Sequence, residues 1–444
     1  VVGDSKQMPP TRVGPPSGGN DDPLADDVGD VEETIEDGES LLVEAVEAGL
    51  HREWLSWHYR SRDESLIAFS NARYYDQRLA SFPSPGTGVA QAVHWRKVEG
   101  QYEHGGRRIN EREAATIVEE VERRVADGGA ATPSIGIVTF NTQQRDEIQQ
   151  RLEASDDERV RSLLDDDGER SLFVRNLEAV QGHERDVILF SVGFSKRADG
   201  SKMPLQFGPL NRDGGERRLN VAITRAREEV VMFTSFEPEE IEEARTSALG
   251  VLHLREYLMA AKYGLDGLEP PQETDGRQDA HVEDVREALA MRGLHVRTNV
   301  GRSRFKIDLV VAASDDDPDP VAVLLDGPGW ASRTTVGDRD GLPATVLQNV
   351  MGWTSVVRVW LPAWRAERER VLTTIEDLVR HGDLGEGPAP SDGPGRVDST
   401  VESAPDRERG ARSDGVDGAD APANAAPGPE RWTADDGAAY AREL

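Results

Sequence analysis

The sequence predicts an α/β fold with two folded units followed by an acidic, disordered tail. Over residues 55–262, short strand-like runs alternate with longer helical ones, which implies a mostly parallel sheet covered by helices. A second, shorter succession of helices and strands occupies residues 279–382. The length of 444 residues suits two or three domains, and 25 prolines, 43 glycines and only 37% apolar residues place part of the chain outside any packed core.

The composition excludes several classes of protein. The chain has no cysteine, which excludes disulfide scaffolds, thiolate nucleophiles and cysteine-based zinc sites. No apolar run approaches the roughly 20 residues that span a bilayer, and no charged-then-apolar leader is present. We therefore expect a soluble, cytoplasmic protein with no membrane partner; its oligomeric state stays open.

The formal charge of −31 at first argues against a nucleic-acid partner, because phosphate binding needs a basic surface. Two explanations of the acidity stay open. Only six of the 52 basic residues are lysines, and an acidic, lysine-poor surface suits a protein that works in multimolar salt. Alternatively, the acid belongs to disordered segments of a chain from a GC-rich genome.

The first unit is preceded by an apolar strand stub, Val1–Asp4, which we interpret as the cut edge of an earlier domain. An acidic loop over residues 20–39 and a helix at Leu41–Leu50 complete a remnant that we assign to residues 1–54. The unit proper covers residues 55–263. Its expected strands are Ser134–Phe140, Leu172–Asn176, Asp186–Val192 and Glu229–Thr234. Its expected helices are Asn110–Ala126, Asn141–Ala154 and Arg217–Arg227.

A linker rich in Gly, Pro, Gln, Asp and Thr separates the two units at residues 264–278. The second unit covers residues 279–382. Its expected elements are a helix His281–Arg292, strands His295–Thr298, Ile307–Ala313 and Val321–Asp326, a helix Thr335–Met351, a strand Val356–Leu361 and a final helix. Residues 383–444 carry 14 acids and 6 bases among Gly, Ala and Pro, so we expect them to be disordered.

Four short motifs follow one another in the first part of the chain. They are Gly3-Asp4-Ser5-Lys6-Gln7-Met8-Pro9-Pro10, Trp57-His58-Tyr59-Arg60, Val180-Gln181-Gly182-His183-Glu184-Arg185-Asp186, and the helical run Arg217–Arg227. Such residues suit phosphoryl transfer, because guanidinium groups stabilise the charge that develops on a γ-phosphate. Arg60 and Arg225 are the candidates for that role. Gln7 is suited to orient the attacking water, and Glu184 is suited to accept a hydrogen bond from a ribose hydroxyl.

Together the four motifs resemble motifs III, IV, V and VI of the superfamily-1 helicases, in the branch that includes the nonsense-decay helicase. The resemblance implies that residues 55–263 are the second RecA-like domain of an ATP-driven motor and that residues 1–54 are the remnant of the first. By resemblance Arg225 is the arginine finger, Gln7 and Arg60 contact the γ-phosphate, and Gly182, Glu184 and Arg218 help to hold the nucleotide. Ile135–Gln144 also resembles a strand of that family, which implies four residues that face a single strand of DNA or RNA: Thr139, Gln144, Asn176 and Gln181.

Half of an ATP site is absent from this sequence. No Gly-x-x-x-x-Gly-Lys-Ser/Thr loop occurs that would cradle phosphates, and no strand ending in Asp-Glu precedes Gly3 to hold magnesium. In the resembling family both lie upstream of motif III. We therefore expect ATP with Mg²⁺ to be shared with a missing upstream domain, and the chain alone to be inactive.

In the second unit, Asp308 and Asp326 stand on neighbouring expected strands, and Glu283 lies on the preceding helix. Carboxylates in such an arrangement suit Mg²⁺ and a nuclease. The unit resembles the restriction-endonuclease-like domains related to very-short-patch-repair nucleases. The matching segments are Phe305–Val311, Leu325-Asp326-Gly327, Asp338–Leu342, Gly352-Trp353 and Arg358–Trp364.

This unit departs from the pattern that it resembles. Leu324 stands where that family has a glutamate, and the expected lysine is missing, with only Lys306 and Arg339 as substitutes. A degenerate fold that binds duplex DNA without cleaving it therefore stays open beside an active Mg²⁺ nuclease. Three tryptophans of this unit, Trp353, Trp360 and Trp364, are expected in the core more than on a base-stacking surface.

Three functions stay open from the sequence. The first is the C-terminal part of an ATP-dependent helicase with a nuclease-like, DNA-binding appendage. The second is a Mg²⁺-dependent DNA nuclease that uses the helicase half to grip a strand. The third is a non-catalytic adaptor, if the missing upstream domain is truly absent.

Overall fold

The computed structural model describes residues 3–8, 41–85, 92–166, 168, 170–197, 199, 201–265, 268 and 279–382. The acidic loop at 20–39, the tail at 383–444 and most of the expected linker lie outside these residues. Contacts join the described residues into one unit. A short helix, α1 (Leu41–Glu47), precedes the two sheets.

The first sheet has five parallel strands in the order β1-β5-β4-β2-β3. They are β1 (Val93–Lys97), β2 (Ile135–Thr139), β3 (Phe173–Asn176), β4 (Arg185–Ser195) and β5 (Ala226–Ser235). The central strand β4 pairs Leu189 with Ile137 of β2 and with Val231 of β5. β2 and β4 are almost wholly buried, and their sequences are accordingly continuous apolar runs without polar alternation.

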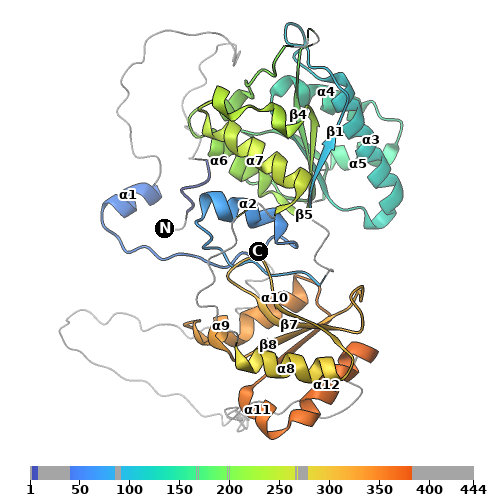
Figure 1. The fold of residues 1–444 in the computed structure, drawn as a ribbon. Coiled ribbons are helices and arrows are strands. Elements are labelled where there is room, and N and C mark those ends of the chain that lie inside the picture. Colours follow the sequence, from blue (N-terminus) through green and yellow to red (C-terminus); the bar gives the residue numbers. More distant parts are fainter. Residues whose placement is uncertain are drawn as a thin grey trace, which may run out of the picture. The chain divides into compact units, whose positions relative to one another are not determined.

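Helices cover both faces of this sheet (Figure 1). One face carries α3 (Glu111–Gly128), α4 (Thr142–Glu153) and α5 (Glu158–Asp165), and the other carries α2 (Ser65–Tyr74), α6 (Gly215–Ile223) and α7 (Leu249–Tyr263). The starts of α3, α4 and α5 are fixed by side chains that accept backbone N–H groups, namely Asn110, Asn141 and Asp157 respectively. Short turns of 3₁₀-helix lie at Gly129–Ala131, Gly208–Asn211, Pro238–Glu240 and Glu243–Arg245.

The second sheet has four strands in the order β6-β7-β8-β9. They are β6 (His295–Val300), β7 (Ile307–Ala312), β8 (Val321–Leu325) and β9 (Ser355–Val359). The first three are antiparallel, and β9 runs parallel to β8. A parallel pair needs a long crossover, which is supplied here by α9 (Pro328–Ala331), the π-helical turn η6 (Gly337–Gly341) and α10 (Leu342–Asn349).

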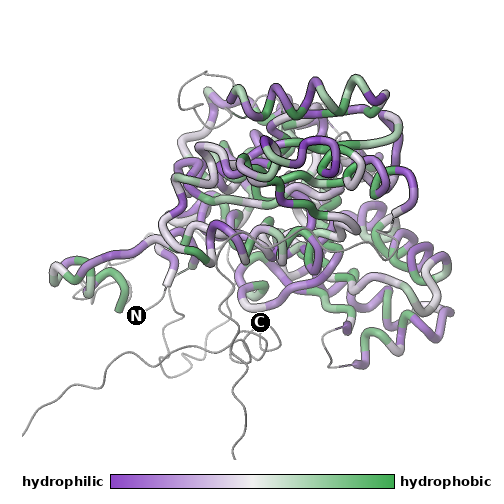
Figure 2. Tube along the Cα trace, turned by 90° about the horizontal axis from the view of Figure 1, so that it is seen from below, coloured by the Kyte–Doolittle hydropathy of each residue, from purple (hydrophilic) through white to green (hydrophobic). Residues whose placement is uncertain are grey.

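Each face of the second sheet has its own core. On one face α8 (Ala280–Met291), α11 (Leu361–Ala366) and α12 (Arg368–His381) pack against the strands. On the other face α10 packs beside Trp353 and two residues from far earlier in the chain, Ala80 and Phe82. Figure 2 shows helices whose trace alternates between hydrophobic and hydrophilic residues, as expected for helices with one face on a sheet.

The predicted α/β fold, with its RecA-like parallel sheet and a second small sheet, is confirmed. The helix expected at Arg217–Arg227 is shorter, because it ends at Ile223 and Ala226 already pairs with Arg185 in the sheet. The helix expected at Thr335–Met351 starts as the π-helical turn η6, and Pro343 occupies the first turn of α10. Four helices and strands of the first unit were not expected from the sequence, namely β1, α2, α5 and α7, and in the second unit the short helices α9 and α11 were not expected.

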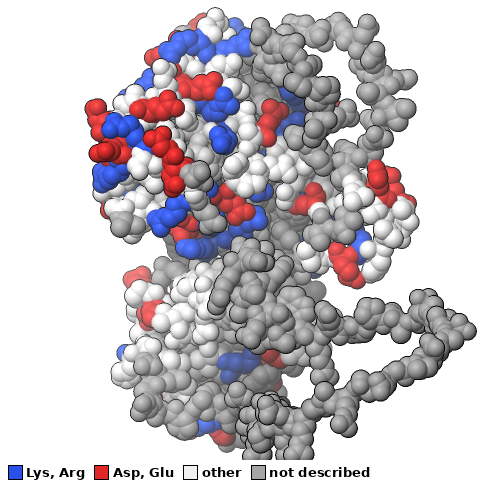
Figure 3. Space-filling model, turned by 180° about the vertical axis from the view of Figure 1, so that it is seen from behind, with Lys and Arg blue, Asp and Glu red and all other residues white. Residues whose placement is uncertain are grey.

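Charged side chains of both signs are exposed in the described part of the chain. On the face shown in Figure 3, acidic and basic residues are interspersed and do not form separate patches. No helix within the described ranges is long and apolar enough to cross a membrane.

Candidate functional site

Arg225 lies at the junction of α6 and β5, where the helix has ended and the strand begins. α6 starts after Gly214, whose φ of +70° lies in the left-handed region that favours glycine. Arg225 is only 4% exposed, and its Nε donates a hydrogen bond of 2.8 Å to the carbonyl of Val221 in the last turn of the helix. The helix end therefore holds this guanidinium in place.

A second cation, Arg60, lies close enough to Arg225 to affect its pKa. Burial lowers the pKa of Arg225, and the positive charge of Arg60 lowers it further. Among the described residues, no carboxylate lies within ion-pair distance of Arg225, whereas Arg60 has such a partner. A buried guanidinium that makes no direct ion pair within the described residues, and that lies near a second guanidinium, is suited to bind an anion.

Arg60 comes from the extended segment before α2, and its Nη2 lies 3.0 Å from the carboxylate of Glu184. Glu184 stands in the turn before β4, two residues after Gly182, which has a φ of +84°. Its other oxygen lies 3.7 Å from Nε of Arg227. The motif that contains Glu184 therefore meets both arginine motifs, although its expected contact with a ribose stays a prediction.

The first motif reaches the same region through a hydrogen-bonded turn. Asp4 accepts hydrogen bonds from the hydroxyl of Tyr75 at 2.8 Å and from Nε2 of Gln7 at 3.1 Å. Asn220 of α6 donates to the carbonyl of Lys6 at 2.9 Å. Since Asp4 and Tyr75 also act electrostatically on Arg225, the structure brings together the three residues expected to act in catalysis, Gln7, Arg60 and Arg225.

Arg218 interacts with a different set of residues. Its Nη1 donates to the carbonyl of Asp213 at 3.0 Å, and its Nε lies 3.5 Å from Glu178. Glu178 is also 3.9 Å from Arg212. Arg218 thus faces the loops beside a cavity, and its expected place at the nucleotide stays untested.

That cavity has a volume of roughly 510 Å³ and opens where β2, β3 and β4 end. Three arginines and four aromatic or imidazole side chains line it: Arg108, Arg197, Arg212, Tyr102, His104, Phe140 and Phe194. In α/β proteins ligands bind outside the carboxyl ends of the strands. Rings that stack on bases, beside arginines that pair with phosphates, are what single-strand binding needs.

Of the four residues expected to face a nucleic-acid strand, two are accessible in the structure and two are buried. Asn176 lines the cavity, and Gln181 is exposed in the turn before β4. Thr139 and Gln144 are fully buried: Thr139 donates to the carbonyl of Asn141 at 2.8 Å, and Gln144 bonds to Asn110 and Ser191. We therefore correct the expectation for these two side chains, because they support the cavity wall from inside. Their neighbours Asn141, Thr142 and Gln143 line the cavity.

Several lining residues were missed in the sequence. Tyr102, His104 and Arg108 lie in one loop between β1 and α3, and Phe194 and Arg197 lie at the end of β4. The run Tyr102–Arg108 places two ring side chains and then two arginines within one short loop, a signal that would have indicated this loop.

At the edge of the second sheet, Asp308 and Asp326 both accept backbone hydrogen bonds. Asp308 accepts from the N–H of Leu325 at 2.8 Å, and Asp326 accepts from the N–H of Leu361 at 2.9 Å. Burial raises the pKa of Asp308 to about 6, although this hydrogen bond and the charges of Arg333 and Arg358 act to lower it. Arg333 was not noted in the sequence, and Arg358 was noted only as the first residue of a matching segment.

The metal site expected here is not assembled. Glu283 pairs with Arg286 one turn along its own helix, with 2.8 Å between Arg286 Nε and the carboxylate. Within the described part of the chain, no three or more His, Asp or Glu side chains lie together in a way that could hold a metal ion. Leu324, at the position of the missing glutamate, is 3% exposed and belongs to the core. The expected set of Asp308, Asp326 and Glu283 is therefore corrected.

The three tryptophans of this unit differ in burial: two are buried and one is partly exposed. Trp353 and Trp364 are 1% and 2% exposed and belong to the core, as expected. Trp360 is partly exposed and packs edge-on against Trp330, with ring centres 5.7 Å apart.

Two protein families match this chain. The AAA domain family matches residues 38–237, and a restriction-endonuclease family named REase_MTES_1575 matches residues 281–379. Both matches agree with the resemblances seen in the motifs.

Two curated relatives are similar to this chain. The uncharacterized ATP-dependent helicase MG140 of Mycoplasma genitalium is 32% identical over 248 residues, which are 52% of this chain and 21% of that protein. The homolog of MG140 in Mycoplasma pneumoniae is 30% identical over 279 residues, which are 58% of this chain and 23% of that protein. The chain thus spans about a fifth of the length of the curated relatives it matches.

Among solved structures, the C-terminal domain of a possible DNA helicase from Lactobacillus plantarum aligns with a TM-score of 0.24 and 11% identity. The alignment covers 40% of this chain and 86% of that chain. At that TM-score the likeness carries no weight, and the fold rests on the strand order described above.

Proposed function

From a chain that carries a helicase-type AAA domain followed by a restriction-endonuclease-like domain, we propose that the protein is part of an ATP-dependent superfamily-1 helicase and supplies the arginine-finger half of its ATP site. The observation that carries this proposal is the meeting of all four motifs. Arg225, Arg60 with Glu184, and the turn that contains Gln7 are linked by the contacts described above.

The chemistry of this cluster suits a transferring phosphoryl group. A γ-phosphate gains no covalent help from protein groups, so its transfer is accelerated by positioning and by charge stabilisation. Arg225, fixed by the end of α6, is suited to act as the arginine finger, and Arg60 is suited to act as a second cation. Gln7 would orient the attacking water. Arg225, Arg60 and Gln7 would contact ATP, while the P-loop and the Mg²⁺ ligands come from another domain.

The cavity at the strand ends is proposed as part of the path of a single strand. Its arginines and rings support this function, and the names of the relatives agree with a nucleic-acid substrate. For the second domain we propose binding of duplex DNA without cleavage. We do not propose nuclease activity, because the described carboxylates do not gather into a metal site.

The experiment is ATP turnover by this chain joined to its upstream P-loop domain, with and without single-stranded nucleic acid. We expect stimulated turnover in the wild type and a loss of roughly 10³-fold or more in Arg225→Ala, the usual worth of an arginine finger. Nucleotide binding should stay within a few-fold of the wild type, because the P-loop half is intact.

The control is Arg112→Ala, which removes an exposed arginine of α3 that lies 4.0 Å from Glu119. This variant should keep full turnover. Full activity in Arg225→Ala would overturn the role of that residue, and absent turnover in the wild type would favour the non-catalytic adaptor.

A further inference from the structure

Trp57, three residues before Arg60, is built into the core of the restriction-endonuclease-like domain. Its indole Nε1 donates a hydrogen bond of 2.9 Å to Asp338 in the turn η6. Its ring stacks on Phe82, with centres 5.2 Å apart and 19° between the planes, and meets Phe305 edge-on at 6.0 Å. Trp57 is therefore anchored by both a polar and an apolar contact.

A second segment of chain continues this anchor. Residues 56–58 pair with Ala80 through two backbone hydrogen bonds, His58 N–H to Ala80 at 2.8 Å and Ala80 N–H to Ser56 at 2.7 Å. Beyond Ala80, the N–H of Ser81 donates to Oγ of Ser303 at 2.8 Å. The indole of Trp353 donates to the carbonyl of Pro83 at 2.7 Å. We call residues 56–64 and 79–84 together the strap.

The strap is held again on the other side of Arg60. Glu64, which precedes α2, is 7% exposed and has no ion-pair partner among the described residues. One of its oxygens accepts from Oγ of Ser81 at 2.7 Å, and the other accepts from the N–H of Arg302 at 2.9 Å. Both ends of the segment that carries Arg60 are thus fixed on the second domain.

The middle of the strap contacts the ATP half-site. The N–H of Arg62 donates to the carbonyl of Arg227 at 2.7 Å, and Arg60 pairs with Glu184. The side chain of Arg60 is 42% exposed, so its own packing does little to fix it. Its position therefore depends on the backbone of the strap.

We propose that Trp57 is a positioning residue for Arg60, and that the restriction-endonuclease-like domain is a structural part of the ATP half-site through its contacts with the strap. This inference rests on the proposed function, because the proposed function assigns Arg60 a role in phosphoryl transfer. It gives the second domain a task that needs no nuclease activity. Because Trp57 is packed on the second domain and lies three residues before Arg60, it fixes the chain within about 10 Å of that arginine.

The test is Trp57→Phe, which keeps a ring against Phe82 but removes the indole hydrogen bond to Asp338 together with part of the ring area. The matched control is Trp330→Phe. Trp330 donates an equivalent hydrogen bond of 2.7 Å to Asp340 in the same turn, but Asp340 does not contact the strap in the described contacts. A general loss of stability in η6 affects both variants, whereas a loss of positioning affects only Trp57→Phe.

Two measurements separate this inference from the proposed function. In the chain joined to its P-loop domain, Trp57→Phe should lower kcat about fivefold to tenfold, the size of one hydrogen bond, with KM for ATP unchanged. In the chain alone, amide exchange at His58 and Arg62 should be faster by a similar factor, since their hydrogen bonds belong to the strap.

Trp330→Phe should match the wild type in both measurements. Equal kcat in Trp57→Phe and the wild type would overturn the inference, as would equal amide exchange. A wild type without ATP turnover would count against the proposed function, and the amide exchange would then still decide whether Trp57 fixes the segment.

Discussion

Glu113 of α3 is a carboxyl group that is buried against the first sheet. It is 0% exposed, and no ion pair to it exists among the described residues. Its oxygens accept hydrogen bonds from the N–H of Gly193 at 2.6 Å and from the hydroxyls of Ser191 at 2.8 Å and Ser235 at 3.0 Å. Burial raises the pKa of Glu113 to about 7, against the lowering effect of these hydrogen bonds.

This raised pKa predicts that folding stability falls as pH rises. Between about pH 4.5 and about pH 7 the folded state binds a proton that the unfolded state has released, so the free energy of unfolding decreases by roughly 3 kcal/mol across that window. Glu113→Gln should remove this part of the slope and be the more stable protein above about pH 7. Urea unfolding of both proteins along a pH series measures the difference.

The control for this residue is Glu111→Gln, two positions earlier on the same helix and exposed. That change should leave the slope as in the wild type, because Glu111 is exposed and its partner Arg107 is exposed as well. Parallel slopes for Glu113→Gln and the wild type would show that the buried group does not carry the pH dependence.

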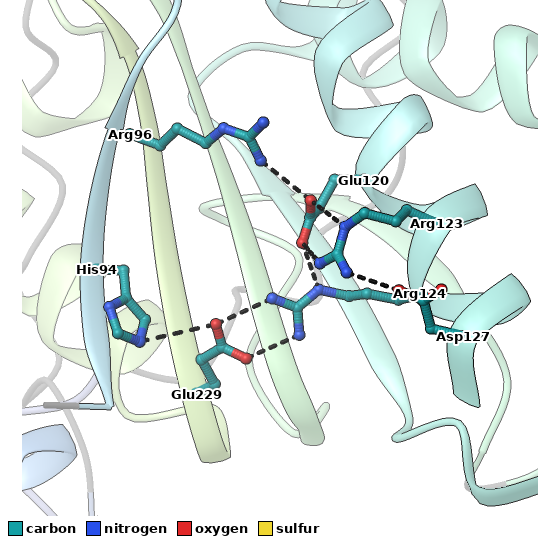
Figure 4. Close-up of polar contacts among 7 residues, drawn as sticks. All are labelled: His94, Arg96, Glu120, Arg123, Arg124, Asp127 and Glu229. Carbon is teal, nitrogen blue, oxygen red and sulfur yellow. Dashed lines mark hydrogen bonds and ion pairs between the residues drawn. The ribbon is translucent and has the colours of Figure 1, made fainter. Parts of the chain in front are cut away.

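At the scale of elements, a network of charges ties α3 to β1 and β5 at the edge of the first sheet (Figure 4). Glu120 of α3 accepts from Arg96 of β1 at 3.0 Å and from Arg123 and Arg124 at 2.6 and 2.7 Å. Arg124 also holds Glu229 of β5 in a bidentate pair of 2.7 and 2.9 Å. Burial acts to raise the pKa of Glu120, but the arginines outweigh it and lower the pKa to about 2.

We expect Glu120→Gln to destabilise the protein by about 2 kcal/mol at neutral pH, because the change removes the charge that three arginines share. The partly exposed Arg96 and Arg123 keep the cost below that of a fully buried pair. The depressed pKa adds stability that is complete above about pH 4.5 and is lost as pH falls toward about 2. Thermal unfolding across this range should therefore show a weaker acid limb in the variant.

Glu119→Gln is the neighbouring control, since the side chain of Glu119 is 63% exposed and lies 4.0 Å from its partner. This variant should unfold like the wild type at every pH. Identical unfolding of Glu120→Gln would mean that the network holds no net stability, as is common for surface pairs.

Helices and strands with a clear hydrophobic pattern could be predicted from the sequence. Elements and side chains whose position depends on contacts with distant residues could not. The continuous apolar runs of β2 and β4 indicated buried parallel strands, whereas β1 carries Arg96 and Lys97 on an edge and gave no apolar run. Motif order likewise predicted that Arg60 and Arg225 meet. It did not predict that Gln144 is buried, because the direction of a side chain at the start of α4 depends on Asn110, 34 residues away.

At the scale of the whole molecule, the charge of −31 is distributed unevenly. Segments outside the described residues hold 30 acidic and 8 basic residues, so the described part has a net charge of about −9. Within that part, ion pairs are numerous, and on the face shown in Figure 3 the acidic and basic side chains are interspersed. The sequence alone left open whether such acidity is an adaptation to high salt.

We expect potassium chloride to stabilise this protein little or not at all. Self-repulsion in a part with a net charge of about −9 is small, while interspersed ion pairs lose attraction as the Debye length falls from about 10 Å at 0.1 M to about 3 Å at 1 M. The free energy of unfolding by urea should therefore fall by about 1 kcal/mol between these concentrations. Glu120→Gln, which lacks one hub of ion pairs, should show a smaller fall. A clear rise in stability with salt would contradict this account and support the salt-adapted origin of the acidic composition.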